Sequence, residues 1–527
     1  MRYAETHFKF KLPWSLLFRP WPEIIFDMPF QVVPHEVPTL WIVVRDADRF
    51  PVNLEQAKIT ITPQDGGAQK DVREIELGIE ANKSIAFYPV KLEGIAPGRY
   101  CIHAEAKVKR LSDGKERRFT RWTLPGLRPE PLTLQVLAED LPKAPGYATG
   151  EMHCHTHYSR DHVEFGATPE VFQQAAKAIG LDFVCCTDHA YDFAFTDEDY
   201  TREAASPAPR FQALRDEIAA LPTSNGEPIL LAGEEVSAGN SKGENVHMTV
   251  LAPEVYLPGL GDCGRYWLDN KPTRKIPAHL EATRAPCFAA HPQQPMGMLE
   301  KFIFHRGYWH TEDLNIGKNH EIRGIQFWNG VRDEGFMLGR KWWIEELGKE
   351  HYLLPIGGND AHGDLNDTTA VDLPLFTLKY SRDHIFGKVR TAIKVSQAIE
   401  EAQNREIDEA QNSKLLSEET LKSAFNSDEC YITDGPALWW EREGKQLHFH
   451  ARSTADMGGA FRYIRIFGRR RLPNGKLAKA EELNLHSQVA ARAKTDITVE
   501  IENFAYLRAE CETASGRFAM TSAAKVG

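Results

Sequence analysis

The sequence predicts an α/β protein in which a closed barrel of β/α units is flanked by N-terminal and C-terminal β-rich, sandwich-like domains. Three observations lead to this prediction. Short β-branched runs fill about the first 146 of the 527 residues, helices then alternate with short apolar strands up to residue 356, and strand-like alternation returns after residue 430. We therefore expect three domains, at 1–146, 147–428 and 429–527.

The N-terminal region has the pattern of short strands at regular spacing. Alternating or β-branched runs occur at 39–44, 57–62, 84–90 and 99–106. Turn dipeptides such as Pro97-Gly98 and Asp113-Gly114 separate them. This spacing favours a β-sandwich.

From residue 150 the pattern alternates between helices and strands. Thr168 and Pro169 open a helix as its N-cap and first helical residue, and Gly180 ends it. We expect strands at 183–186, 229–232, 246–251, 287–290, 322–328 and 353–356, and helices at 211–221, 278–284 and around 342–347. The alternation indicates a parallel sheet, and the number of units favours a closed barrel over an open sheet.

The remaining chain is expected to be helical at about 386–426 and β-structured from 429 to the end. Strand-like alternation occurs at 446–451, 461–466 and 497–501. Pro473, Asn474 and Gly475 are typical of a hairpin turn. These residues predict a second β domain.

Composition and charge exclude several classes of protein. The net charge of −11 provides no field for gripping a polyanion, and the basic stretches at 107–110, 117–118 and 469–471 flank predicted hairpin turns, so we expect no nucleic-acid partner. No apolar run is long enough to span a bilayer, and the first 30 residues do not resemble an export signal. The eight cysteines are scattered. We expect free thiols in a reducing compartment, a cytoplasmic protein and no membrane partner.

Metal-binding side chains lie at or near the end of six predicted strands. They are His153, His155, Asp188, His189, Glu234, Glu235, His247, His291, Asp360 and His362. Because the carboxyl ends of barrel strands converge on one face, we expect these side chains to meet in one pocket. Period-2 alternation points both imidazoles of His-x-His to the same side and points Cys154 away, as a packed thiol. Imidazole and carboxylate are ligands of Zn, Mn and Fe, so the sequence predicts a metal cluster.

At these residues the chain resembles the PHP (polymerase and histidinol phosphatase) family of metal-dependent hydrolases. The family's motifs are matched in order by His153, His155 and Asp161, by Thr187, Asp188 and His189, by Gly233 and Glu235, by His247 and His291, and by Asp360 and His362. The resemblance covers about residues 148 to 380. The β-rich flanks and the Ile-Thr-Asp-Gly-Pro run at 432–436 are similar to the carbaryl-hydrolase-like subgroup.

The resemblance implies a distorted (β/α)7 barrel that holds two or three divalent ions. The ligand sets it implies are His153, His155, Glu235 and Asp360 for one ion, Asp161, His189 and His362 for a second, and Glu235, His247 and His291 for a third. Two choices stay open. His162 competes with Asp161, which we favour, and Glu234 competes with Glu235, which matches the motif spacing and leaves Glu234 to support a ligand.

Closely spaced Zn, Mn or Fe ions make hydrolysis the natural reaction, because they lower the pKa of a bound water and neutralise charge on a substrate oxygen. We expect a phosphoesterase in which a metal-bridging hydroxide attacks phosphorus in line and a nearby histidine or water protonates the leaving group. Glu235, His291 and Asp188 are expected to take part in catalysis. One alternative is an amidase, carbamate hydrolase or ester hydrolase with the same site. The other is a metal-dependent binding or scaffold protein without turnover.

Loop residues extend these expectations to the substrate. The cations Arg160, Lys242 and Arg332 would suit a small anionic substrate, and the polar residues Asn245, Gln293, Asn329 and Tyr158 are candidate contacts. We expect Trp309, Trp328, Trp342 and Trp343 to be core residues for the most part. The substrate itself and the oligomeric state stay open.

Overall fold

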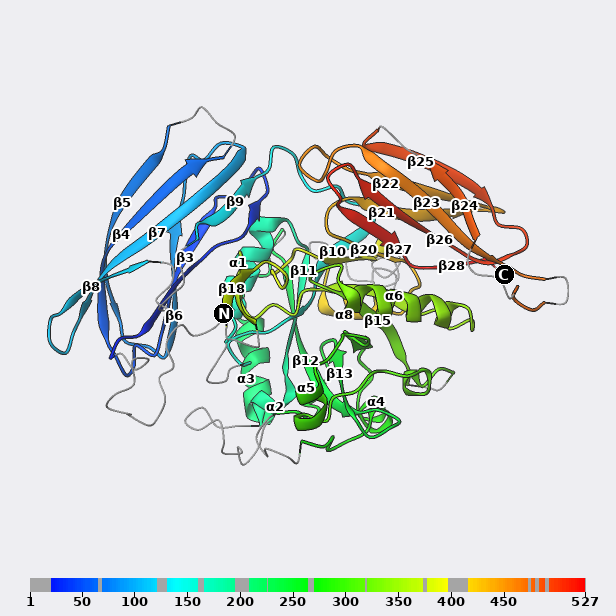
Figure 1. The fold of residues 1–527 in the computed structure, drawn as a ribbon, viewed down its shortest axis with the longest axis horizontal. Helices are drawn as coiled ribbons and strands as arrows, with labels where there is room; N and C mark the ends of the chain where they lie inside the picture. Colours follow the sequence, from blue (N-terminus) through cyan, green and yellow to red (C-terminus); the bar gives the residue numbers. More distant parts are fainter. Residues whose placement is uncertain are drawn as a thin grey trace, which may run out of the picture. The chain divides into compact units, whose positions relative to one another are not determined.

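The computed structural model describes residues 20–64, 69–120, 130–159, 165–194, 208–224, 226–263, 270–317, 320–372, 377–396, 416–472, 475–478, 483–488 and 492–526. Strands far outnumber helices in this part of the chain (Figure 1). The chain forms two compact units. The first comprises Met1–Asp140, Arg160–Gly180 and Ala361–Phe386, and the second comprises Leu141–Ser159, Leu181–Asp360 and Gly387–Gly527. The three-domain division stays a prediction.

The described part of the first unit contains two larger sheets that share an apolar core, and a third sheet of two strands. The strands of the unit are β1 (Glu23–Asp27), β2 (Gln31–Val32), β3 (Thr39–Arg45), β4 (Val52–Pro63), β5 (Asp71–Ala81), β6 (Ile85–Lys91), β7 (Gly98–Arg110), β8 (Glu116–Thr120), β9 (Leu132–Val136), β17 (Thr368–Asp372) and β18 (Thr377–Ser381). One larger sheet has the order β1-β3-β6 and the other β2-β9-β7-β4-β5, with β8 on β7, and the third sheet pairs β17 with β18. Every second side chain turns inward, as Ile42, Ile59 and Ile102 do, and these are fully buried.

The helix predicted from Thr168 also belongs to the first unit. It is α1 (Pro169–Ile179), and the Thr168 hydroxyl accepts a hydrogen bond from Val171 N at 3.4 Å. Gly180 ends it with a φ of 80°, in the left-handed region that glycine adopts without strain. Both predicted ends of this helix are confirmed.

The second unit is built on a fourteen-stranded sheet. Its strands are β10 (Tyr147–Cys154), β11 (Phe183–His189), β12 (Ile229–Gly239), β13 (Asn245–Val250), β14 (Cys287–Ala290), β15 (Ile322–Asn329), β16 (Leu354–Gly358), β19 (Arg390–Lys394), β20 (Cys430–Thr433), β23 (Phe461–Arg470), β24 (Leu483–Gln488), β26 (Phe504–Thr513), β27 (Phe518–Thr521) and β28 (Ala524–Lys525). The order is β16-β15-β14-β13-β12-β11-β10-β19-β20-β27-β26-β23-β24, with β28 on β26. The helices are α2 (Ala190–Phe193), α3 (Ala208–Ala219), α4 (Ile276–Ala282), α5 (Met298–Ile303), η1 (Thr311–Leu314), α6 (Glu334–Leu347) and α8 (Glu418–Ala424).

The predicted fold class, a distorted (β/α)7 barrel between sandwich-like domains, is wrong. The main sheet follows an open path, the pairs β12–β13 and β13–β14 are antiparallel, and the C-terminal strands continue the same sheet. Only residues 240–244 separate β12 from β13, too few for the helix that a parallel crossover needs. β19 pairs antiparallel with the edge of β10, although residues 390–394 fall in a stretch predicted to be helical.

A second, smaller sheet completes the C-terminal part of this unit. Its order is β21-β22-β25, with β21 (Ala437–Glu443), β22 (Gln446–Arg452) and β25 (Lys494–Glu500). Leu438 and Phe449 of this sheet share an apolar core with Ile464 and Leu507 of the main sheet. The predicted turn residues Pro473 and Asn474 lie outside the described residues.

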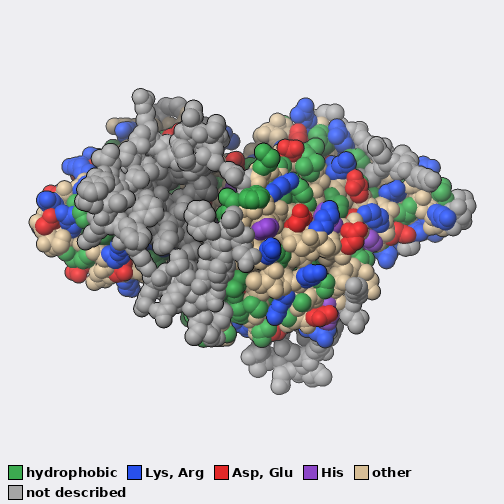
Figure 2. All heavy atoms as spheres, turned by 60° about the horizontal axis from the view of Figure 1, so that its bottom comes forward, with side chains coloured by type: hydrophobic (Ala, Val, Ile, Leu, Met, Phe, Trp, Pro, Cys, Tyr) green, Lys and Arg blue, Asp and Glu red, His purple; other side chains and the backbone are tan. Residues whose placement is uncertain are grey.

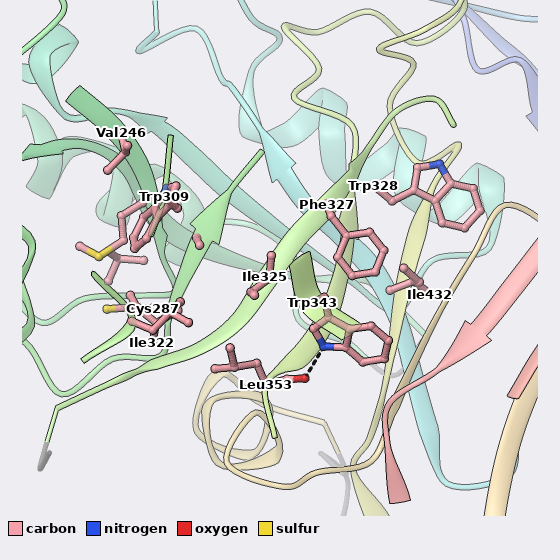
Figure 3. Close-up of a cluster of buried hydrophobic side chains, with 14 of the residues drawn as sticks. Val246, Cys287, Trp309, Ile322, Ile325, Phe327, Trp328, Trp343, Leu353 and Ile432 are labelled. Atoms are coloured by element: carbon pink, nitrogen blue, oxygen red, sulfur yellow. Dashed lines mark hydrogen bonds between the residues drawn. The ribbon is translucent and has the colours of Figure 1, made fainter. Parts of the chain in front are cut away.

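Tryptophans fill the core of the second unit beside the main sheet (Figure 3). Trp309, Trp328 and Trp343 are at most 1% exposed, and Trp342 packs against the same cluster half-buried. Trp343 Nε1 donates to Leu353 O at 2.8 Å. The prediction that these side chains are mostly core residues is confirmed.

The surface and the cysteines show ordinary features. On the face drawn in Figure 2, Lys and Arg side chains are interspersed with Asp and Glu. All eight cysteines are free thiols, and Cys154 is fully buried, as predicted. Within the described ranges, no helix has both the length and the apolar character needed to cross a membrane.

Candidate metal centre

The His-x-His motif lies at the end of β10, where both of its imidazoles point into the second unit. His153 and His155 are fully buried, and their Nε2 atoms lie 3.2 Å apart. The alternation of the strand that brings them together also sends Cys154 to the other side, where its thiol donates to Cys185 O at 3.4 Å.

Glu235 lies at the centre of the histidines. Residues 229–235 of β12 pair one by one with β11, and the last of these pairs joins Glu235 to His189. The shortest distances from its carboxylate oxygens to imidazole nitrogens are 2.7 Å to His247, 3.0 Å to His189, 3.0 Å to His291, 3.4 Å to His153 and 3.5 Å to His155. A carboxylate that is 1% exposed therefore faces five imidazoles.

Asp360 joins this cluster from the end of β16. Its backbone N donates to His153 O at 2.7 Å, and its Oδ1 lies 3.0 Å from His155 Nε2. Asp360 has a φ of 54° and His291 a φ of 29°, both in the left-handed region. Strained backbone at two residues of one cluster is typical of a functional site.

These side chains form two groups that could each hold a metal ion. The first group is His153, His155, Glu235 and Asp360, and the second is Glu235, His247 and His291. The ligand atoms of each group lie within 4.8 Å of one another. The structure thus brings seven predicted ligands together, counting His189 beside Glu235, and both groups share Glu235.

The hydrogen bonds around the first group fit a cation. His153 Nδ1 lies 2.8 Å from Gln326 Oε1, and His155 Nδ1 lies 3.1 Å from Ser159 Oγ. With a proton on each Nδ1, the two Nε2 lone pairs face each other, which is unfavourable unless a positive charge lies between them. Glu235 Oε2 is buried, and the two imidazole nitrogens near it, His189 Nδ1 at 3.0 Å and His155 Nε2 at 3.5 Å, are not aligned for a regular hydrogen bond. The donor set and its surroundings therefore fit a divalent ion.

The pKa values of Glu235 and its neighbouring histidines also fit a site for a cation. Burial raises the pKa of Glu235, but the charges of His247 and His153 hold that pKa well below its usual value. Burial lowers the pKa of His153 and His247, but Glu235 raises them to about 9 and about 10. Without an ion, protons on these imidazoles supply the positive charge that the carboxylate requires, and an ion would replace them.

Two carboxylates near the cluster have other contacts. Asp188, predicted to be catalytic, accepts hydrogen bonds from Thr156 N at 2.8 Å, Ser159 N at 2.9 Å and Thr156 Oγ1 at 2.8 Å. Glu234 is fully buried and accepts hydrogen bonds from Leu257 N at 3.0 and 3.2 Å. Glu235, rather than Glu234, faces the imidazoles.

Two predicted ligands cannot be placed in the cluster. Asp161, like its competitor His162 and the predicted substrate contact Arg160, lies outside the described residues. His362 belongs to the first unit, whereas the cluster belongs to the second. The ion site predicted from Asp161, His189 and His362 stays a prediction.

Most predicted substrate contacts bond to other parts of the protein. Arg332 pairs with Glu512 at 3.2 Å, and Asn245 and Gln293 donate to backbone carbonyls. Asn329 is the one of these four that bonds to a ligand, since its Nδ2 donates to Asp360 Oδ2 at 3.4 Å. Within the described structure, the exposed Lys242 and the half-buried Tyr158 do not bond to the ligand groups.

Sequence reasoning missed several residues that hold the ligands. Gln326 bonds to His153, and Asp262 lies 2.9 Å from His247 Nε2. Glu151 accepts hydrogen bonds from His153 N and Asn359 N, both at 3.0 Å, and so joins β10 to the end of β16. Of these three residues, only Glu151 could have been suspected from the sequence, because it is an acidic residue two positions before the His-x-His motif.

Comparison with known proteins gives no family. No protein-family model matches the chain, and no curated protein matches it. Among solved structures, the β-D-mannosidase from Dictyoglomus thermophilum has a TM-score of 0.21 and 12% identity, over 95% of this chain and 67% of that one. The Bacteroides uniformis β-glucuronidase has a TM-score of 0.19 and 11% identity, over 95% and 60%. The chain thus spans about two thirds or less of these proteins, and likeness this weak establishes no shared fold.

Proposed function

We propose that the second unit is a metal-dependent hydrolase of the PHP type that acts on small phosphoesters. The observation that carries the proposal is the shared carboxylate, because Glu235 belongs to both groups of ligands. The order of the motifs along the sequence, from His153 to Asp360, supports the resemblance to the PHP family.

Each group would hold one divalent ion, of Zn, Mn or Fe. His153, His155 and Asp360 would complete the first group and His247 and His291 the second, with Glu235 common to both. Bound there, the ions would activate a water for attack and neutralise charge on the substrate.

The chain's own residues would orient these ligands and the substrate. Gln326 holds His153 by Nδ1, and Asp188 anchors the backbone at Thr156 and Ser159 that follows His155. Arg306 lies beside the second group, with its Nη2 at 3.2 Å from His247 Nε2 and its Nε at 2.6 Å from Asp262 Oδ2. Because this guanidinium is paired with Asp262, the choice of a phosphoester rests on the resemblance to the PHP family.

A substrate panel with metal analysis tests the proposal. The purified protein, loaded with Mn²⁺, Zn²⁺ or Fe²⁺, is given p-nitrophenyl phosphate, bis(p-nitrophenyl) phosphate, p-nitrophenyl acetate and an aryl carbamate. We expect turnover of a phosphate substrate that chelation abolishes. Turnover of acetate or carbamate alone would favour the alternative reactions, and inertness at full metal occupancy would favour a binding protein.

Two variants tie the activity to the site. His153→Ala and Asp360→Asn should each lower the metal content by about one ion and the rate by at least about 100-fold, because the first removes a ligand of the first group and the second removes the charge of one. Asn suits position 360 because it tolerates the left-handed backbone better than most residues. Wild-type activity in either variant would refute the assignment.

A further inference from the structure

Asp262 is a buried carboxylate that the proposed ligand sets do not use. It lies between β13 and α4, and its side chain is completely inaccessible to solvent. Its Oδ2 lies 2.9 Å from His247 Nε2 and 2.6 Å from Arg306 Nε, and its Oδ1 accepts a hydrogen bond from the Ser237 hydroxyl. Three donors from three segments therefore fix this carboxylate in one orientation.

The contact with Asp262 determines which nitrogen of His247 is available. Because a carboxylate accepts, Asp262 keeps a hydrogen on Nε2 of His247, so that Nδ1 is the nitrogen that would give its lone pair to an ion. His247 Nδ1 lies 2.7 Å from Glu235 Oε1, within the second ligand group. Trp309 Nε1 also donates to His247 O at 3.1 Å, so both the ring and the backbone of this residue are held.

Arg306 makes this arrangement compatible with burial. A single imidazole lies between the carboxylates of Glu235 and Asp262, and an unpaired buried charge is costly. The guanidinium of Arg306 pairs with Asp262 and so offsets its charge. The first group is held differently, because His153 Nδ1 meets the neutral amide of Gln326.

We propose that Asp262 is a positioning residue that holds His247 with Nδ1 toward Glu235 and so makes the Glu235–His247–His291 group an ion site separable from the first. This inference rests on the metal centre of the proposed function. It predicts that the two groups respond differently to loss of Asp262.

Asp262→Asn tests the inference by metal binding. The chelated full-length variant is titrated with Zn²⁺ in competition with a chromogenic chelator, and bound zinc is counted by elemental analysis. We expect one ion to bind as in the wild type and a second to bind about 10–100-fold more weakly, the usual cost of removing a hydrogen-bond partner of a ligand. Two ions bound with wild-type affinities would overturn the inference.

Glu346 provides a matched control within the same unit. This carboxylate is also fully buried and bonds to a histidine, a cation and a hydroxyl, in His351, Lys349 and Thr311. Glu346→Gln should lower the unfolding temperature of the chelated protein without changing either zinc affinity. If it weakens the second ion as Asp262→Asn does, the effect is a general loss of stability and the inference fails.

Two further measurements keep the inference testable if Asp262→Asn folds poorly. Ser237→Ala removes the donor to Asp262 Oδ1 and should weaken the second ion alone, by less than Asp262→Asn. In a His247→Ala background, Ser237→Ala should have no further effect on zinc binding, whereas an undiminished effect would refute action through His247.

If the wild type binds no ion under any loading, the proposed function itself fails; if it binds two and these variants leave both affinities unchanged, only the inference about Asp262 fails.

Discussion

At the scale of single residues, Glu235 determines whether the cluster can hold more than one ion. Glu235→Gln keeps the shape of the side chain but removes its charge and replaces one ligand oxygen with an amide nitrogen. We expect loss of both ions and a fall in hydrolysis of at least about 100-fold, because both groups share this carboxylate. Elemental analysis and the phosphatase assay measure the two effects. A full metal count in the variant would contradict the shared role.

Asp188 gives a different prediction, because its oxygens bond to the chain rather than to an imidazole. Asp188→Ala leaves Thr156 N and Ser159 N without their acceptor, because both donate to the same oxygen, Oδ1. We expect a loss of about 1–3 kcal/mol in the free energy of unfolding, the usual cost of an unsatisfied buried donor. Denaturant unfolding of the chelated protein measures it. A purely catalytic role would instead lower activity without changing stability.

The residues of the site were predictable to the extent that they follow strands. His153, Glu235, His291 and Asp360 lie where predicted strands end or come close to ending, and an extended chain places them at a common edge. Asp262 and Gln326 could not be found in this way, because they bond to ligands that lie 15 and 173 residues away and no sequence pattern marks them.

At the scale of elements, the hairpin of β12 and β13 is the main departure from the predicted fold. The apolar run at 229–232 predicted a short strand, but β12 continues to Gly239 and returns directly as β13. In this hairpin Ser237 pairs with His247, so that the antiparallel turn places His247 beside Glu235. The pattern of side chains predicted where the strands lie. Whether neighbouring strands run parallel, and whether the sheet closes into a barrel, depended on the length of the connections between strands, which the pattern does not determine.

Gly358, at the end of β16, allows the close approach of the strand to His153. A Cβ at this residue would lie 2.9 Å from His153 Cβ and 3.1 Å from His153 N. Gly358→Ala should therefore lower the free energy of unfolding by about 1–3 kcal/mol, as overpacking of a close contact does. Zinc affinity should fall with it because His153 must move. Wild-type zinc affinity together with wild-type stability would show that the site tolerates the shift.

A second contact between elements predicts a dependence on pH. Glu510 of β26 pairs with Arg340 of α6 and with the buried Arg508. Burial raises the pKa of Glu510, but the charges of Arg508 and Arg340 hold that pKa below its usual value of 4.5. A folded-state pKa below the unfolded one stabilises the protein above the unfolded value, and this contribution is lost as the pH falls.

Glu510→Gln isolates this contribution. In the chelated protein, the difference in unfolding free energy between wild type and variant should be constant above about pH 5.5 and shrink as the pH falls from about 4.5 to 3. Urea unfolding at several pH values measures it. A difference that stays constant down to pH 3 would show that the ionised carboxylate contributes nothing through this pair.

At the scale of the whole molecule, ion binding should stabilise the unit that contains the ligands. An ion that binds the folded state alone at 100 times its Kd adds about 2.7 kcal/mol to the stability of the structure that holds it. The ligands in both groups come from β10, β12 and β13 and from the ends of β14 and β16, all in the second unit. Zn²⁺ should therefore slow hydrogen exchange of backbone amides in these strands and leave those of β4 and β7 in the first unit unchanged. Mass spectrometry can measure this exchange with zinc bound and after chelation. If zinc protects both units equally, the ion stabilises the chain by some means other than these ligands.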